Sequence, residues 1–264
     1  MKTIALALTI TFPMLCYAEP PVDIGKDKYS ISIGFFLPAV DTNIRLDSGT
    51  LGRGTDINLE DDLGFDTEQN TGRLDGYIRF APKHRLGVGL FSMNRKASGI
   101  IDRTIQFGDR VFVVNTAINS AFKTKIILAN YMYSFIQKPK LEAAVAVGVH
   151  YMTTEATLTT SGGTISSSAK ADGPLPLIGL DLKYAASPKI HLGLLAQWFK
   201  VDAGDYDGSI QTINASVEYL VQKNIGIGVG YNRFSVDYNV NDSFFKGALR
   251  YSYGGPQIFA SMRF

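Results

Sequence analysis

The feature that most constrains this chain is the alternation of apolar residues with small or polar ones along most of its length. From Tyr29 to Leu37 every odd-numbered residue is apolar, whereas three of the four residues between them are Ser or Gly. A period of two is typical of a half-buried β-strand and not of a helix. The pattern recurs in residues 28–38, 74–81, 85–95, 126–135, 141–152, 175–185, 189–199, 211–220, 224–234 and 244–264. We therefore expect an all-β fold with ten strands.

The connections between these segments are of two kinds. Four are short and contain Lys, and three of those also contain Pro, as expected of tight turns; they lie at residues 81–85, 137–140, 186–189 and 221–224. The others, which alternate with them, lie at residues 38–72, 96–120, 153–173, 202–208 and 238–243. Such alternation predicts an up-and-down meander with tight turns at one end and longer loops at the other.

The two faces of the strands indicate which side meets lipid. Within residues 225–232 one face carries Ile, Ile, Val and Tyr, and the other carries three Gly and an Asn. A soluble sandwich or a lipocalin-like barrel is the alternative, but small and polar faces such as this one do not suit a soluble core. A membrane barrel has its apolar face outside.

Two further observations favour the membrane barrel. Tyrosines, which favour the bilayer interface, end many of the apolar stripes; these are Tyr29, Tyr133, Tyr151, Tyr184, Tyr219, Tyr231 and Tyr253. The segments also have the length of about 9–11 residues that a tilted membrane strand needs. Because an open strand edge would leave amides unsatisfied in hydrocarbon, the first and last strands must pair. The prediction is a closed antiparallel up-and-down transmembrane β-barrel.

The first 18 residues have the layout of a secretory signal peptide, with Lys2, an apolar stretch from Ile4 to Leu15, and Ala18 before the cleavage site. A membrane anchor and a lipidated Cys16 are the alternatives, but the apolar stretch is short for a spanning helix. Cleavage leaves one domain, residues 19–264, and removes the only cysteine, so no disulfide can form. The mature chain has 26 − 1 = 25 basic and 24 acidic residues, a balance that favours no nucleic-acid partner.

The segment QIFASMRF ends in Phe264, with Met262, Ala260 and Ile258 at alternate positions before it. Together with the signal peptide, the alternating strands and the loop pattern, it resembles the Gram-negative outer-membrane β-barrel superfamily over nearly the whole mature chain. The resemblance implies that these four residues are a signal read by the barrel assembly machinery. It also implies periplasmic chaperones, outer-membrane lipid and lipopolysaccharide as partners, and a place in the outer membrane with both termini in the periplasm.

The apolar residues of the last segment change parity along the strand. They are odd-numbered at Leu249, Tyr251 and Tyr253, and even-numbered from Ile258 onward. A β-bulge at residues 254–256 is the simplest explanation, because it adds one residue to a strand. A tight turn there is the alternative, and it would add an eleventh strand.

The residues expected to face the lumen carry charges of both signs. In a narrow barrel such charges should pair, because an unpaired charge away from water is costly. We therefore expect a largely plugged interior. The predicted lumen network consists of Arg73, Asp75, Arg79, Glu142, His150, Asp181, Lys183, Glu218, Lys246 and Arg250.

Two features bear on catalysis or ligand binding. His150 is the best-placed histidine, with Glu155 nearby in sequence, but no Ser stands two residues after it as in a lipid A deacylase, so a lumen-filling role is favoured. The first long loop is acidic and suggests a cation site, although its spacing lacks the features of an EF-hand. The possible loop-binding residues are Asp56, Glu60, Asp61 and Asp62. The alternative is a solvated loop, or a short helix with Asn58 as N-cap and with apolar residues folded over the barrel mouth.

Three classes of function follow. The leading one is a non-enzymatic integral outer-membrane barrel with long extracellular loops, a largely plugged lumen and a structural or binding role at the cell surface. The second is a narrow porin-like channel or a conduit for small solutes. The third is a surface hydrolase acting on lipid A, phospholipid or protein. No motif predicts a cofactor, a metal ion or a catalytic set.

Overall fold

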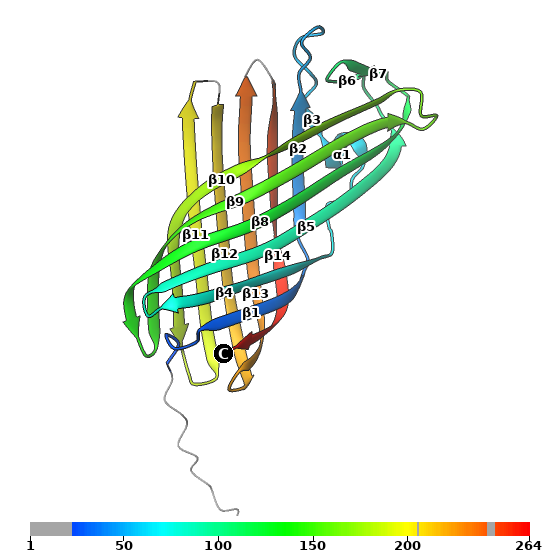
Figure 1. Ribbon diagram of the computed structural model, residues 1–264. Coiled ribbons are helices and arrows are strands. Elements are labelled where there is room, and N and C mark those ends of the chain that lie inside the picture. Colours follow the sequence, from blue (N-terminus) through cyan, green and yellow to red (C-terminus); the bar gives the residue numbers. More distant parts are fainter. Residues whose placement is uncertain (1–22, 205, 242–245) are drawn as a thin grey trace, which may run out of the picture.

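The computed structural model describes residues 23–204, 206–241 and 246–264, so the expected signal peptide, residues 1–18, lies outside the described residues. The chain forms long antiparallel strands that follow one another around a ring (Figure 1). The strands of the ring are β1 (Tyr29–Phe36), β2 (Ala39–Leu46), β4 (Thr71–Ala81), β5 (His84–Ile100), β8 (Ala117–Lys138), β9 (Leu141–Thr160), β10 (Ser166–Ala185), β11 (Ile190–Ala203), β12 (Tyr206–Gln222), β13 (Ile225–Asn241) and β14 (Lys246–Arg263). The loops carry β3 (Ile57–Asn58), α1 (Leu59–Leu63), β6 (Ile105–Phe107) and β7 (Arg110–Phe112). No helix in the described ranges is long and apolar enough to cross a membrane.

The strand pairing returns from the last strand to the first. β1 pairs with β4 on one side and with β14 on the other, where Ser30 lies opposite Arg263. After Leu37 and Pro38 the chain continues as β2 along the same edge of β14. β1 and β2 are therefore two parts of one interrupted strand, and the all-β ring of ten strands is confirmed.

Several strands are longer than a bilayer requires. β8 has 22 residues, and β9 and β10 have 20 each, whereas about 9–11 tilted residues suffice to cross. The expectation of a loop at residues 153–173 is therefore largely wrong, because β9 and β10 continue through most of that range, whereas residues 101–116 form a loop within the expected range 96–120. At the other end of the ring the strands meet in tight turns, as expected; Pro82-Lys83 joins β4 to β5 and Pro139-Lys140 joins β8 to β9.

The lower half of the ring, which contains these turns and the C-terminus in Figure 1, is apolar on its outer face. On β13 the outward side chains of Ile227, Val229 and Tyr231 are each about half exposed. The next outward residues above them are Arg233 and Ser235, and a similar change to polar residues occurs along the other long strands. We call this outer band the apolar belt. Its exposed members include Ile31, Ile33, Phe35, Ile78, Phe80, Val88, Tyr133, Val147, Tyr151, Ile178, Tyr184, Trp198, Val217, Tyr219, Ile258 and Phe264.

In the upper half, the apolar residues point into the ring. Leu249, Tyr251 and Tyr253 of β14 are buried, whereas Arg250 between them is exposed. β14 pairs with β13 without any register shift, so both the predicted β-bulge at residues 254–256 and the alternative of an eleventh strand are wrong. The parity changes because β14 runs from the upper half, where its inner face is apolar, into the lower half, where its outer face is apolar.

Buried apolar side chains form one cluster inside the upper half. They come from strands on both sides of the ring and from the loops above it. Its members include Phe36, Ile57, Leu59, Phe65, Phe91, Met93, Phe107, Phe112, Phe122, Met152, Ile210, Phe234, Tyr251 and Tyr253. The upper half is thus built like a water-soluble β-structure, with an apolar interior and a polar exterior.

The ladder between neighbouring strands is interrupted at two places in the upper half. The first seam lies between β2 and β5. The strand β4 begins at Thr71, which is its upper end, and does not reach high enough to lie between them. The chain covers this seam itself: β3 pairs with β2, and Glu68 forms a bridge with Ala39. The helix α1 follows β3 directly, so one loop seals the first seam.

The second seam lies between β10 and β11. The two strands pair only as far as Ile178 opposite Trp198, although β10 extends upward to Ser166. Pro174 and Pro176 provide the reason, because proline has no N–H to donate and is confined to the free edge of a sheet. Within the described ranges no strand pairs with this edge of β10 above Ile178.

Candidate functional site

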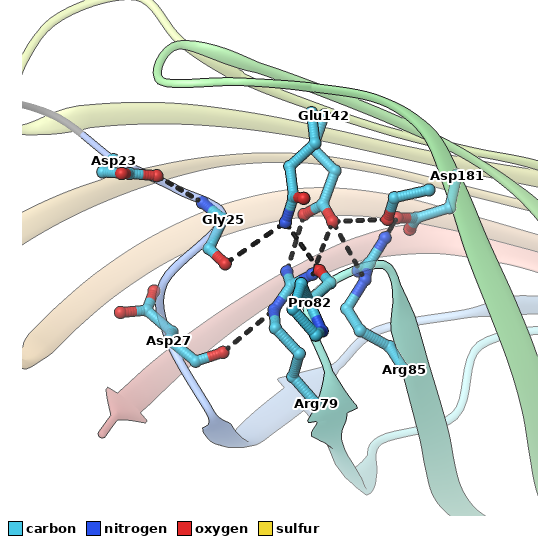
Figure 2. A network of polar contacts seen from close by, with 10 residues as sticks. Asp23, Gly25, Asp27, Arg79, Pro82, Arg85, Glu142 and Asp181 are labelled. Carbon is cyan, nitrogen blue, oxygen red and sulfur yellow. Dashed lines mark hydrogen bonds and ion pairs between the residues drawn. The ribbon is translucent and has the colours of Figure 1, made fainter.

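Charged side chains fill the lumen of the lower half, and we call this set the polar plug. Its members are Arg79, Arg85, Glu142, Asp181, Glu218 and Arg263. The carboxylate of Glu142 accepts hydrogen bonds from Nη1 and Nη2 of Arg79, at 2.8 and 2.9 Å, and from Oγ of Ser134 at 2.5 Å. Nε of Arg85 lies 3.5 Å from the same carboxylate, and its Nη2 donates to Asp181 at 2.5 Å (Figure 2). Charges from β4, β5, β9 and β10 are thereby joined.

The plug continues toward the other side of the ring. Glu218 of β12 forms an ion pair with Arg263 of β14 and accepts a hydrogen bond from Ser261. Nζ of Lys183 lies 3.8 Å from the centre of the Tyr77 ring, a cation–π contact. Together these contacts join strands from around the ring across the lumen.

A further ion pair lies nearer the middle of the barrel. Nε and Nη2 of Arg73 donate to the two carboxylate oxygens of Asp75 at 2.6 and 2.9 Å. Both residues line a cavity of about 240 Å³ that remains in the lower half. The lower lumen is therefore lined by charged and polar side chains and keeps a cavity large enough for several water molecules.

An aromatic layer crosses the lumen above the plug. We define it as Phe36, Phe91, His150, Phe234 and Tyr253, none of which is more than 4% exposed. The ring of Tyr253 stacks on Phe91 and on Phe234, with centroids 4.7 and 5.1 Å apart, and Phe36 meets it edge-on at 5.6 Å. His150 stacks on Phe234 at 6.1 Å. Because β9 and β13 are four strands apart in a ring of ten, the layer spans the interior.

His150 lies in the interior of the barrel and is 1% exposed. Its two ring nitrogens are buried and have no hydrogen-bond partner among the described residues. The ring stacks on Phe234. The side chain contributes bulk to the aromatic layer.

The acidic first loop contains a short helix, which confirms the structural alternative for this segment. Asn58 is its N-cap, with the side-chain oxygen accepting the N–H of Asp61 at 2.8 Å. Gly64 ends it in a left-handed conformation with φ of 71°, which glycine adopts without strain. Leu59 and Leu63 are buried, so α1 closes the upper mouth of the ring with its apolar face.

The acidic residues of this loop do not converge on one point. Each of three pairs with arginine and the fourth, Asp61, is exposed. The pairs are Glu60 with Arg95 at 2.6 Å, Asp62 with Arg103 at 3.0 Å, and Asp56 with Arg45 at 3.3 Å and with Arg53 at 2.9 Å. Within the described residues no group of three or more His, Cys, Asp or Glu is placed to hold a metal ion. Through Arg45 of β2 and Arg95 of β5 these carboxylates fasten the loop to the ring, and through Arg103 they join it to the loop after β5.

The same ion pairs shift the ionisation of the loop residues. Partial burial tends to raise the pKa of Asp56, but the hydrogen bonds and charges of Arg53 and Arg45 outweigh it and hold the pKa below 3.8. The hydrogen bond to Asp62 raises the pKa of Arg103. Both effects favour the charged forms that hold the loop at neutral pH.

Two of the predicted lumen residues lie outside the barrel. Nε of Arg250 donates to Asp237 at 2.8 Å on the outer surface, where the arginine side chain is 64% exposed, and Lys246 is also exposed. The prediction for both is wrong because it assumed that the apolar face of β14 meets lipid along its whole length. Above the belt that face points inward, so the charges between its residues point outward.

Arg85 and Arg263 complete the polar plug but are not among the predicted lumen residues. Arg85 falls at the end of a predicted turn, residues 81–85. Alternation along the strand is the signal that identifies it. Leu86 and Val88 are on the lipid face of β5, so Arg85, one position earlier, is on the lumen face. Arg263 likewise lies between the outward residues Met262 and Phe264, so its side chain is on the lumen face.

Comparisons with known proteins bear on the fold. No protein-family model and no curated protein matches the chain. Among solved structures it is similar to the outer membrane protease OmpT from Escherichia coli, with a TM-score of 0.58 and 10% sequence identity over 93% of this chain and 99% of that one. It is also similar to the toluene transporter TbuX from Ralstonia pickettii, with a TM-score of 0.39 and 12% identity over 93% of this chain and 92% of that one. The likeness to OmpT shows that this chain has the fold of an outer-membrane β-barrel protein.

Proposed function

We propose that this chain is a non-enzymatic integral outer-membrane barrel with a sealed lumen, and that its folded upper half has a structural or binding role at the cell surface. The observation that carries the proposal is the aromatic layer, which spans the interior above the polar plug and shares four of its five members with the apolar cluster of the upper half. A porin keeps a polar, water-filled lumen along its whole length. The polar plug and the apolar cluster above it oppose such a path.

The proposal fixes an orientation. The apolar belt lies in the lipid, the tight turns face the periplasm, and the upper half projects into the medium. Ile258, Met262 and Phe264 point outward and are 40–62% exposed, and with Ala260 they are available to the assembly machinery as the predicted signal. The partners under this proposal are that machinery, periplasmic chaperones, outer-membrane lipid and lipopolysaccharide.

Conductance in planar bilayers tests the sealed lumen. We expect the refolded mature chain, residues 19–264, to insert without producing openings in a bilayer where a general porin gives stable steps. The double variant Phe234→Ala with Tyr253→Ala removes the centre of the aromatic layer and should produce measurable conductance. The control Phe107→Ala with Phe112→Ala removes similar bulk from the apolar core of the upper loops and should not. Large, stable openings of the unmodified chain would refute the proposal.

A further inference from the structure

The second seam opens into a pocket of about 560 Å³. We call it the seam pocket, and its apolar lining includes Met152, Leu175, Phe199, Ile210, Val236 and Tyr238. These residues come from β9, β10, β11, β12 and β13, so the pocket lies between the two groups of strands that separate above Ile178. Its volume and apolar lining match those of sites that bind small molecules.

The two seams differ in what fills them. At the first seam the chain supplies its own apolar side chains, with Ile57, Leu59 and Leu63 all buried. In the part of the chain that the structure describes, no comparable segment enters the second seam. Since apolar side chains fill the first seam, we expect an apolar group to fill the second.

The position of the pocket at the upper edge of the apolar belt indicates that its occupant has one polar end. Ile178 and Trp198, the last paired residues below the seam, belong to the apolar belt and are 48% and 56% exposed. Pro174 lies opposite Tyr151 at the upper edge of the belt. Lys170 and other charged residues line the pocket above that level. A molecule in the pocket thus has an apolar part level with the lipid edge and another part level with water.

Charge at the rim distinguishes among headgroups. The rim carries the carboxylates of Asp172, Asp207 and Asp237 against the single ammonium of Lys170. Asp237 is paired with Arg250 outside the pocket, whereas Asp172 accepts a hydrogen bond from the neutral hydroxyl of Tyr151 at 2.5 Å. Excess negative charge disfavours an anionic headgroup by like-charge repulsion.

We propose that the seam pocket binds a single-chain amphiphile whose headgroup carries no negative charge, its hydrocarbon tail between β10 and β11 and its headgroup beside Asp172 and Asp207. This inference rests on the proposed binding role at the cell surface. It does not depend on the seal, because the aromatic layer and the polar plug lie outside the pocket lining. Absence of binding in a chain that still does not conduct would overturn the inference alone.

Equilibrium binding in lipid nanodiscs tests it without detergent. The mature chain is embedded in nanodiscs and titrated with radiolabelled monolauroylglycerol, with laurate as the anionic probe of equal tail length and glycerol as the headgroup alone. We expect saturable binding of one monolauroylglycerol per chain above the uptake of empty nanodiscs. Laurate should bind about tenfold more weakly, equivalent to about 1.4 kcal/mol, and glycerol should not bind. Uptake equal to that of empty nanodiscs, or equal affinity for laurate, would overturn the proposal.

Matched variants locate the site. Ile210→Trp fills the pocket and should weaken monolauroylglycerol binding by at least about tenfold. Ile213→Trp, on the opposite face of the same strand, should leave it unchanged. Because added bulk can perturb folding, the second test is Asp172→Lys with Asp207→Lys at exposed positions, which should raise the affinity for laurate above that of the unmodified chain. Unchanged binding in Ile210→Trp, or unchanged laurate affinity in the double variant, would overturn the placement.

Discussion

Replacing Glu142 by Gln tests whether the polar plug stabilises the barrel. The carboxylate accepts two charge-assisted hydrogen bonds from Arg79 and lies 3.5 Å from Arg85, and the side chains of Arg85 and Glu142 are fully buried. Glutamine has nearly the same shape, but it cannot offset the positive charge of the two arginines. Hydrogen bonds to charged groups contribute about 1.5–3 kcal/mol each, and breaking a buried ion pair costs about 3–5 kcal/mol. We expect the free energy of unfolding to fall by about 3–5 kcal/mol.

The measurement is equilibrium unfolding in guanidinium chloride in detergent micelles. Trp198 is the only tryptophan and is exposed on the apolar belt, so its fluorescence reports transfer from the micelle to water. The matched control is Asp237→Asn, which removes a carboxylate from an ion pair whose side chains are 46% and 64% exposed. Exposed pairs contribute about 0.2–1 kcal/mol, so the control should differ little from the unmodified chain.

A small effect would refute this reasoning. If Glu142→Gln and Asp237→Asn lowered the free energy of unfolding equally, by less than about 1 kcal/mol, water in the lower lumen would be screening the plug. The plug would then fill space without fixing the barrel, and the expected cost of an unpaired charge would not apply.

Two further predictions concern the belt and the first loop. Ile227→Lys places a charge on the apolar belt and should lower the free energy of unfolding in lipid by about 2–4 kcal/mol. Ser235→Lys, on the same face above the belt, should change the free energy of unfolding by less than about 0.5 kcal/mol. Equal effects of the two variants would contradict this position of the membrane. Asp56 has a folded-state pKa below 3.8, so its contribution to holding the loop is present above that ordinary value and is lost as the pH falls through the lowered one. Pepsin cleavage within residues 47–70, normalised at each pH to cleavage of a denatured control protein, should therefore increase only below about pH 4 and should lose this pH dependence in Asp56→Asn; a normalised increase that already begins at the upper end of pepsin's working range would contradict it.

Local pattern was enough to predict much of the fold. The period of two in residues such as Tyr29 to Leu37, together with turns such as Pro139-Lys140, predicts ten antiparallel strands because it depends only on backbone geometry and on the pleat. Small and polar faces opposite apolar ones predict a polar lumen, and this holds in the lower half, where Glu142 and Asp181 lie. The N-cap at Asn58 was also a local signal.

The features that the sequence does not predict depend on what surrounds each face of a strand, and the alternation of its residues does not reveal this. Alternation indicates that the two faces of β14 differ, but it does not indicate which face is inside, so Arg250 was placed in the lumen and a bulge was expected. The apolar face meets lipid in one half of the barrel and the interior in the other, and the closure of the ring decides between the two.

The pairing of strands far apart in sequence decided the remaining features. The aromatic layer brings together Phe91 and Tyr253, and the seam pocket joins β9 and β10 to β12 and β13. The sequence shows Pro174 and Pro176, which cannot donate backbone hydrogen bonds to a neighbouring strand. The pocket forms only because β10 and β11 separate above Ile178 in the folded chain. The sequence alone determined that the chain alternates, turns back and meets lipid, because these depend on neighbouring residues. The aromatic layer and the seam pocket came from tertiary structure, since each requires side chains from several strands to meet.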